Sequence, residues 1–198
     1  MAFVAGSWMI YAGGRTESPP LPDAAQAVSR SVQATAPYMK PMAESPPTRI
    51  RIPRIGVDAP VIGLHADQAG HLQTPPTSPS NVVGWYRDGA RPGSTGNAII
   101  AGHVDTARGP GVFYSLGALR KGDIITVTRA DRSTAVFFVY GIEIYAKNAF
   151  PNDRVYGATQ QPELRVITCG GAYTKATGYQ ANVVVYARLT KSVDTAIH

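Results

Sequence analysis

Cysteine is nearly absent from this 198-residue chain, which contains only Cys169. A single cysteine excludes an intrachain disulfide framework and leaves too few thiols for a structural zinc site. Charged residues are also sparse, at 16%, yet a hydrophobic content of 44% argues against a wholly disordered chain. With 20 glycines and 16 prolines, the composition favours a turn-rich all-β protein over a helical bundle.

Runs of basic residues are missing, although the formal net charge is +6. The charges of residues 1–48 balance, so the whole excess lies in residues 49–198, where Arg120 and Lys121 are the only adjacent basic pair. A nucleic-acid-binding protein concentrates such residues in clusters, so we expect no nucleic-acid partner. Dispersed positive charge is also suited to attraction to an anionic cell envelope or membrane surface.

No charged residue occurs among the first fourteen, MAFVAGSWMIYAGG. This stretch is shorter than the roughly 20 apolar residues of a spanning helix, and it lacks the basic start of a complete signal peptide. We interpret residues 1–14 as the remnant of an N-terminal membrane anchor; a disordered apolar terminus and a short packed helix are the alternatives. Residues 15–48 contain seven prolines and no glycine, which predicts an extended, semi-rigid linker that buries little surface.

Strand-like segments fill residues 49–190, which we expect to be the globular domain, with residues 191–198 as a C-terminal tail. One short helical turn is predicted where Phe113, Leu116 and Leu119 recur at intervals of three. A closed or nearly closed β-barrel of about eight strands, with one or two short helices, is the simplest architecture because closure removes exposed edges. The predicted strands are residues 49–57, 59–64, 81–86, 97–105, 124–130, 134–147, 163–169 and 179–189, and the predicted core includes Val82, Ile99, Ile100, Val127, Phe138, Ile144, Val166 and Val184.

Cys169 ends one of these apolar segments and is followed by Gly170 and Gly171. It is either a buried small hydrophobe or a nucleophile, and a nucleophilic thiol normally needs a histidine beside it. Of the four histidines, only His103 closes an apolar strand-like segment; it lies 66 residues before Cys169. A histidine and a cysteine at two strand ends could meet at one mouth of a barrel.

The segments GNAIIAGHVD, FYSLGALRKGD and RVITCGG, followed by NVVVYARL, resemble the sortase family, most closely the actinobacterial class F, with class E next. The resemblance runs from about Arg49 to Leu189 and includes the spacing between His103 and Cys169. It implies an all-β, eight-stranded sortase barrel and a cysteine transpeptidase. Such an enzyme cleaves an LPXTG-like sorting signal of surface proteins between Thr and Gly and transfers the protein to an amine of a peptidoglycan precursor.

The same resemblance implies an N-terminal membrane anchor and a position on the extracellular face of the membrane of a Gram-positive cell. It implies no cofactor, and because the sequence has no dense carboxylate cluster we also predict that no metal is needed. Carried over to this sequence, the resemblance makes Cys169 the nucleophile that forms the thioester and His103 the general acid and base.

Two positions depart from the family pattern. The signature TLxTC reads here as residues 165–169, so Arg165 replaces the first Thr while Thr168 is kept; Arg165 is about 13 Å from Cys169 along an extended strand. Asn182 stands where sortases usually carry a catalytic Arg. We predict that Asn182 takes the oxyanion or substrate-positioning role, unless it is a turn residue. Arg165, Lys175 or Arg188 could supply the missing positive charge.

Trp85 and Thr168 are predicted to bind substrate, although ordinary barrel packing explains Trp85 equally well. Tyr173 and Tyr179 flank the loop after the nucleophile and could contact either substrate. Two other functions fit the sequence. One is a tethered, non-catalytic β-barrel module that binds an envelope peptide or glycan and buries an inert Cys169; the other is a cysteine peptidase that only hydrolyses its substrate.

Overall fold

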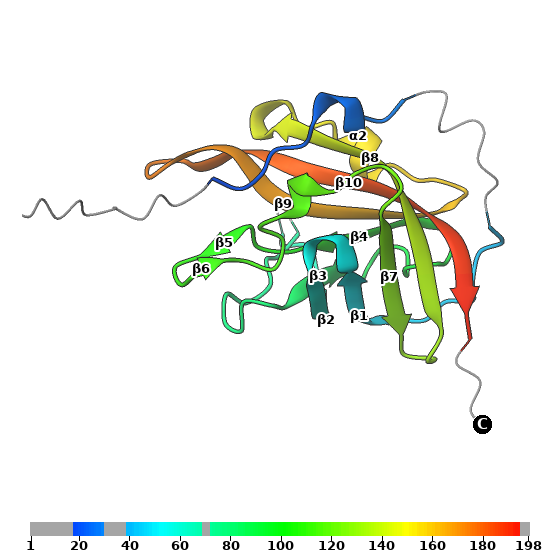
Figure 1. The fold of residues 1–198 in the computed structure, drawn as a ribbon. Coiled ribbons are helices and arrows are strands. Elements are labelled where there is room, and N and C mark those ends of the chain that lie inside the picture. Colours follow the sequence, from blue (N-terminus) through cyan, green and yellow to red (C-terminus); the bar gives the residue numbers. More distant parts are fainter. Residues whose placement is uncertain (1–17, 30–38, 69–71, 195–198) are drawn as a thin grey trace, which may run out of the picture.

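Eight strands form a closed barrel in the computed structural model, which describes residues 18–29, 39–68 and 72–194 (Figure 1). Their order around the barrel is β1-β2-β3-β4-β9-β10-β8-β7. This arrangement confirms the predicted all-β, eight-stranded barrel. The strands are β1 (Pro47–Ile52), β2 (Val57–Leu64), β3 (Val83–Tyr86), β4 (Gly96–Ala101), β7 (Ile124–Arg129), β8 (Thr134–Ala146), β9 (Pro162–Thr174) and β10 (Gly178–Val193).

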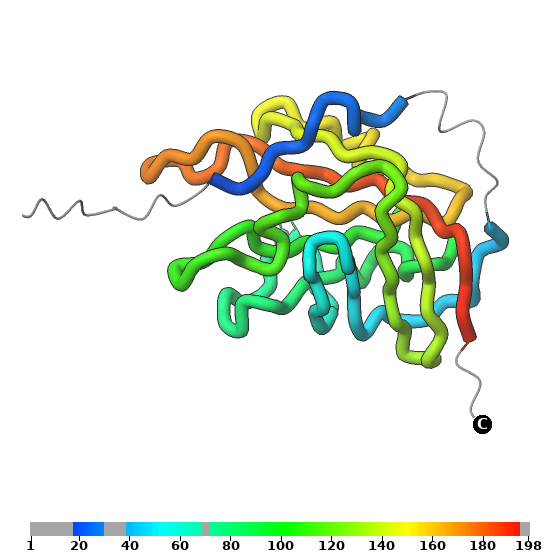
Figure 2. The backbone as a smooth tube through the Cα atoms, viewed as in Figure 1, coloured from blue at the N-terminus to red at the C-terminus, as the bar shows by residue number. Residues whose placement is uncertain are grey.

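Parallel pairing between β4 and β9 is the feature of the barrel that builds the site. Most neighbouring strands are antiparallel, but β4 runs beside β9 in the same direction, with Ala101 opposite Ile167. The carboxyl ends of these two strands therefore reach the same edge of the barrel. The β9–β10 hairpin continues beyond this edge, as the orange tube in Figure 2 shows.

The described helices are all short. The 3₁₀ turn η3 (Leu116–Ala118) lies within the segment predicted to be helical. A five-residue α-helix, α2 (Asn152–Tyr156), was not predicted, because five residues are too few to show a helical period. The remaining short elements are the 3₁₀ turns η1 (Ala24–Gln26), η2 (Pro53–Ile55) and η4 (Lys147–Ala149) and the small hairpin of β5 (Asp105–Thr106) and β6 (Gly109–Pro110).

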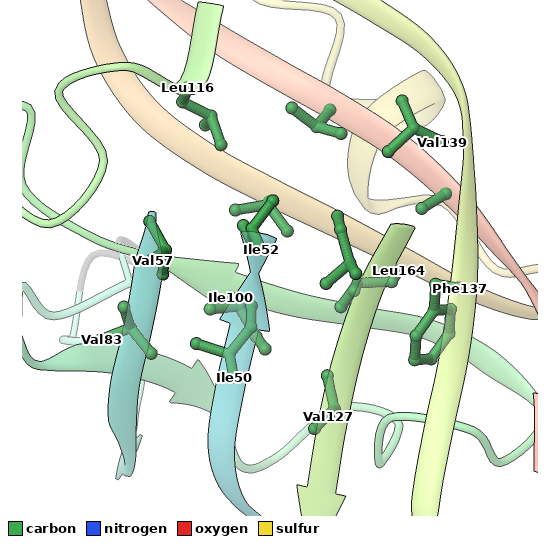
Figure 3. Close-up of a cluster of buried hydrophobic side chains, with 14 of the residues drawn as sticks. Ile50, Ile52, Val57, Val83, Ile100, Leu116, Val127, Phe137, Val139 and Leu164 are labelled. Atoms are coloured by element: carbon green, nitrogen blue, oxygen red, sulfur yellow. The ribbon is translucent and has the colours of Figure 1, made fainter. Parts of the chain in front are cut away.

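Two apolar clusters lie on the two faces of the barrel wall. The larger fills the interior with β-branched, leucine and aromatic side chains, including Ile52, Ile100, Val127, Phe137 and Leu164 (Figure 3). The smaller lies on the outer face of β4, β9, β10 and β8, under α2, and contains Ile99, Ile167, Val184, Tyr186, Tyr140 and Val155. The alternation along the strands thus buries apolar residues on both sides of this part of the wall.

Most of the predicted core is buried, but Ile144 is not. Its side chain is 38% exposed, and Phe138 is only partly buried. The reason is that β8 pairs with β7 only as far as Phe138 and continues beside β10 alone. An apolar residue in that extension has fewer neighbours to cover it.

The N-terminal segment contacts the barrel. Residues 18–29, which we call the strap, run across β8 and the loop after η3, and are blue in Figure 1. The Val28 amide donates to Glu143 Oε1 at 2.8 Å, and the Lys121 amide donates to Gln26 Oε1 at 2.8 Å. Gly141 makes room for the strap, since a Cβ there would lie 2.3 Å from Val28 Cγ2. The strap therefore contacts the barrel through hydrogen bonds and Val28, although none of its residues is buried.

The predicted anchor, residues 1–14, lies outside the described residues. Within the described part of the chain, no helix is both apolar enough and long enough to cross a membrane. Residues 39–46 also follow the barrel surface, where the Met42 amide donates to Gly93 O at 2.8 Å. The barrel thus has contacts with its N-terminal segment on two separate sides.

Candidate active site

A cavity of about 960 Å³ opens where β4, β9 and β10 come together at one edge of the barrel. Its wall contains four of the five predicted site residues, which are His103, Thr168, Cys169 and Asn182. The outer faces of β4 and β9, the loop of residues 72–75 and the segment 156–159 after α2 complete the wall. The structure therefore brings the predicted nucleophile and the predicted base to one cavity.

Cys169 and Asn182 are directly opposite each other on neighbouring strands. They form a cross-strand pair between β9 and β10, so their side chains lie on the same face of the sheet. Neither is at a strand end: β9 continues to Thr174, and Asn182 lies within β10. The predicted strand end at Cys169 is wrong because the two glycines after it remain in the strand. Gly171 has a φ of 78° beside a register shift, a local irregularity of the kind that glycine accommodates.

Backbone contacts hold His103 next to β9. The Gly102 amide donates to Ile167 O at 3.1 Å, and the Thr168 hydroxyl donates to Gly102 O at 2.8 Å. On the other side of the histidine, the Phe113 amide donates to His103 O at 3.0 Å. Thr168 is 4% exposed, so its hydroxyl positions the residue before His103.

The imidazole of His103 contacts the loop that covers the cavity. Its Nε2 atom lies 2.7 Å from the carbonyl oxygen of Pro75. A carbonyl oxygen only accepts, so Nε2 carries the hydrogen in this arrangement. For His103 to exchange a proton with a substrate through Nε2, the contact with Pro75 has to open.

Cys169 is a free thiol with intermediate exposure. The Asn182 side chain also faces the cavity and has no hydrogen bond to another described residue. It therefore has two amide N–H donors available beside the thiol. A thiol, an imidazole and an amide donor on one wall are the groups that acyl transfer through a thioester requires.

None of the three basic residues considered as substitutes for a catalytic Arg lines the cavity. Arg165 is buried on the outer face of β9, where it pairs with Glu163 at 2.5 Å and lies 4.5 Å from the ring centre of Tyr186. Arg188 is opposite Glu163 on β10 and lies against the rings of Phe138 and Tyr140. Lys175 is exposed in the turn between β9 and β10. The described cavity wall has no Lys or Arg.

Trp85 is the predicted site residue that the structure keeps away from the cavity. It is 5% exposed, belongs to the interior cluster and donates from Nε1 to Ala90 O at 3.0 Å. The next residue, Tyr86, lies on the cavity wall instead. Strand alternation could have found Tyr86, because consecutive residues of a strand face opposite sides.

Sequence reasoning did not assign a role to Asp105, which also lines the cavity. It follows His103 by two residues, and a carboxylate so near a candidate base was a usable signal. It also missed the cavity wall formed around α2 by Asn152 and Tyr156, for which the sequence offered no signal. Among the described residues, no group of three His, Cys, Asp or Glu side chains is arranged to hold a metal ion.

The fold and the site define a closed-barrel protein with a cysteine and a histidine on one cavity wall. The Sortase domain profile matches residues 50–190, which is most of the chain. The protein therefore belongs to the sortase family. No curated protein sequence matches it.

Solved sortases have similar structures. Listeria monocytogenes sortase A is 19% identical, with a TM-score of 0.57 over 77% of this chain and 92% of its own. SrtA from Actinomyces oris is 22% identical, with a TM-score of 0.56 over 81% of this chain and 89% of its own. Streptococcus agalactiae sortase C1, solved in complex with MTSET, is 16% identical, with a TM-score of 0.57 over 77% and 73%. At these identities the likeness shows the fold alone.

Proposed function

We propose that this protein is a cysteine transpeptidase that cleaves an LPXTG-like sorting signal between Thr and Gly and transfers the protein to a cell-wall amine. The observation that supports this most directly is the free, partly exposed Cys169 on the same cavity wall as His103, within a chain of the sortase family. A binding module would have no need of a thiol exposed to its cavity. Cys169 is the nucleophile, and His103 is the general acid and base.

The reaction has two halves joined by a thioester. The Cys169 thiolate attacks the Thr carbonyl carbon, the C–N bond to Gly breaks, and the His103 imidazolium protonates the departing amine. The acceptor amine then attacks the thioester carbonyl and gives its proton to neutral His103, while the C–S bond breaks and restores the thiolate. A tetrahedral oxyanion forms in each half.

Asn182 is the residue of the described cavity wall that we assign to the oxyanion. It lies opposite Cys169 across the β9–β10 pair, and its amide has free donors. An amide donates hydrogen bonds as a guanidinium does, but it supplies no positive charge. Removing one oxyanion donor typically slows an acyl transfer by about 100-fold or more.

The sortase class, the membrane anchor and the cellular location are proposed from the sequence motifs. Class F is the class that GNAIIAGHVD and RVITCGG most resemble, and we propose it here. We also propose that residues 1–14 belong to an N-terminal membrane anchor and that the protein acts at the extracellular face of a Gram-positive cell membrane. The substrates are then the sorting signals of surface proteins and an amine of a peptidoglycan precursor.

The test is to incubate the full chain with an LPXTG-like peptide and diglycine amide, beside Cys169→Ala. We expect cleavage and ligation, both lost in the variant, and a covalent adduct of Cys169 with iodoacetamide. If the peptide is cleaved but only hydrolysed product forms in the presence of diglycine amide, the protein is a cysteine peptidase instead. A thiol that resists alkylation, together with no turnover on a library of sorting-signal peptides, refutes the enzyme and favours the binding module.

A further inference from the structure

The cavity around Cys169 and His103 carries very little charge, although the chain has a formal net charge of +6. Among the described residues of its wall, Asp105 is the only carboxylate, and Lys and Arg are absent. A cation that enters this cavity meets one negative side chain and no fixed positive side chain of Lys or Arg. The cavity therefore favours a positively charged group near Asp105.

Asp105 is held in place and remains accessible. Its Oδ2 atom accepts a hydrogen bond of 2.6 Å from the Tyr179 hydroxyl of β10, and the residue is exposed. Burial and the bond to Asp105 raise the pKa of Tyr179 above its usual range, so the phenol stays a donor at any physiological pH. No described Lys or Arg pairs with Asp105. A carboxylate accepts about four hydrogen bonds, so most of its capacity is open.

The tyrosine that donates to Asp105 packs against a second tyrosine. Tyr173 and Tyr179 are cross-strand partners in the β9–β10 hairpin, and their ring centres are 5.0 Å apart. Tyr173 is 59% exposed, so its ring is accessible to a ligand. A carboxylate with open acceptor capacity binds an ammonium group by ion pairing, and an exposed tyrosine ring adds cation–π attraction to a cation that reaches its face.

We propose that Asp105, together with the rings of Tyr173 and Tyr179, binds the ammonium group of the acceptor that resolves the thioester on Cys169. This inference rests on the proposed transpeptidase function and names the chemical class of its second substrate. The acceptor is a primary ammonium without a carboxylate beside it, because a second negative charge would be repelled by Asp105. The terminal amine of an amidated glycine peptide meets this requirement.

The acceptor nitrogen loses two protons in this step. The acceptor binds as R–NH₃⁺ and releases one proton to water, and the neutral amine attacks the thioester carbonyl. His103 takes the second proton from the attacking nitrogen as the C–S bond breaks. The products are an amide, the Cys169 thiolate and the His103 imidazolium, which are the groups that begin the next cycle.

A competition between two nucleophiles tests the proposal on the full chain. Diglycine amide is mostly a cation at neutral pH, whereas hydroxylamine is mostly uncharged. Both are offered together with an LPXTG-like peptide, and the ratio of ligated peptide to hydroxamate is measured. Because both products come from the same thioester, slower thioester formation does not change the ratio.

Asp105→Asn is expected to lower the ratio about tenfold, the effect of losing one charge-assisted hydrogen bond. Higher salt should lower the ratio of the wild type and leave that of Asp105→Asn unchanged. The matched control is Asp153→Asn, which removes an exposed carboxylate from α2 and should leave the ratio unchanged. Tyr173→Leu is expected to lower the ratio a few-fold.

Three results would overturn the inference. An unchanged ratio in Asp105→Asn means that this carboxylate does not bind the acceptor. An equal fall in Asp153→Asn means that the general field of the protein acts, and not a local site. If the wild type, like Cys169→Ala, gives no product with either nucleophile, the proposed transpeptidase function itself is refuted. If hydroxamate forms without ligated peptide, the thioester does form, and only the proposed acceptor site is refuted.

Discussion

Gly141→Ala is expected to destabilise this protein, although the same change in an uncovered strand stabilises a fold. Replacing a glycine at an ordinary φ stabilises by about 0.4–1 kcal/mol, because the unfolded chain loses freedom. At Gly141 the added methyl would lie 2.3 Å from Val28 Cγ2 and 3.1 Å from Val28 Cα. The nearest obstacles all belong to Val28, so the strap and not the barrel resists the change.

The magnitude follows from what the strap loses when it moves. Its hydrogen bond from the Val28 amide to the Glu143 carboxylate contributes about 1.5–3 kcal/mol, as bonds to charged groups do. The half-buried Val28 side chain adds about 1 kcal/mol of apolar burial. Freed strap residues regain conformational entropy, which offsets part of this loss. We therefore expect Gly141→Ala to lower the free energy of unfolding by about 1–2 kcal/mol.

Urea unfolding of four full-length proteins measures this effect: wild type, Gly141→Ala, Val28→Ala and the double variant. Val28→Ala removes the methyl that clashes, so the cost of Gly141→Ala should shrink, with a coupling of about 1 kcal/mol. The control is Gly63→Ala on β2, where the new methyl meets only the flexible side chain of Arg87 at 3.3 Å. If Gly141→Ala stabilises both the wild type and Val28→Ala by the same amount, docking of the strap on β8 is refuted.

Three further changes test the site. Asn182→Ala should lower kcat about 100-fold with an unchanged unfolding midpoint; a loss of less than threefold would contradict the oxyanion role. Thr168→Val should destabilise by about 1–2 kcal/mol, because Gly102 O loses its donor, and should also lower kcat as His103 shifts; full activity at reduced stability would contradict the positioning role. Glu143→Gln weakens the link to Arg154 of α2, so KM for the peptide should rise a few-fold with little change in kcat, and an unchanged KM would contradict that link.

Sequence patterns predicted the barrel well because the strand signals are local in the sequence. Turn residues flank nearly every β-branched run, which made the strands recognisable. The side of the wall was not predicted, since Ile99, Phe138 and Val184 of the predicted core belong to the outer cluster. The failures lie where tertiary pairing extends a strand. The local sequence does not show whether β8 stops where its pairing with β7 stops or continues beside β10. The exposure of Ile144 could therefore not be predicted.

Only part of the candidate site was predictable from the sequence. Residue type and motif pointed to Cys169 and His103, and the match to the position where sortases usually carry a catalytic Arg pointed to Asn182. The contact of His103 with Pro75 depends on a loop path between β2 and β3 that no periodicity encodes. The docking of the strap was missed for a similar reason, since a proline-rich composition describes local stiffness and not the surface that a segment meets.

The parallel pairing of β4 and β9 also determines when the proposed nucleophile and base can come together. His103 and Cys169 are 66 residues apart, and β7, β8 and α2 lie between them in the chain. Contacts of such long sequence separation form late, because closing the loop costs entropy before any contact compensates it. A newly made or partly folded chain therefore carries a cysteine with no histidine beside it. Only completion of the barrel brings both side chains to one cavity wall, so the catalytic pair of the proposed function is not assembled while the chain folds.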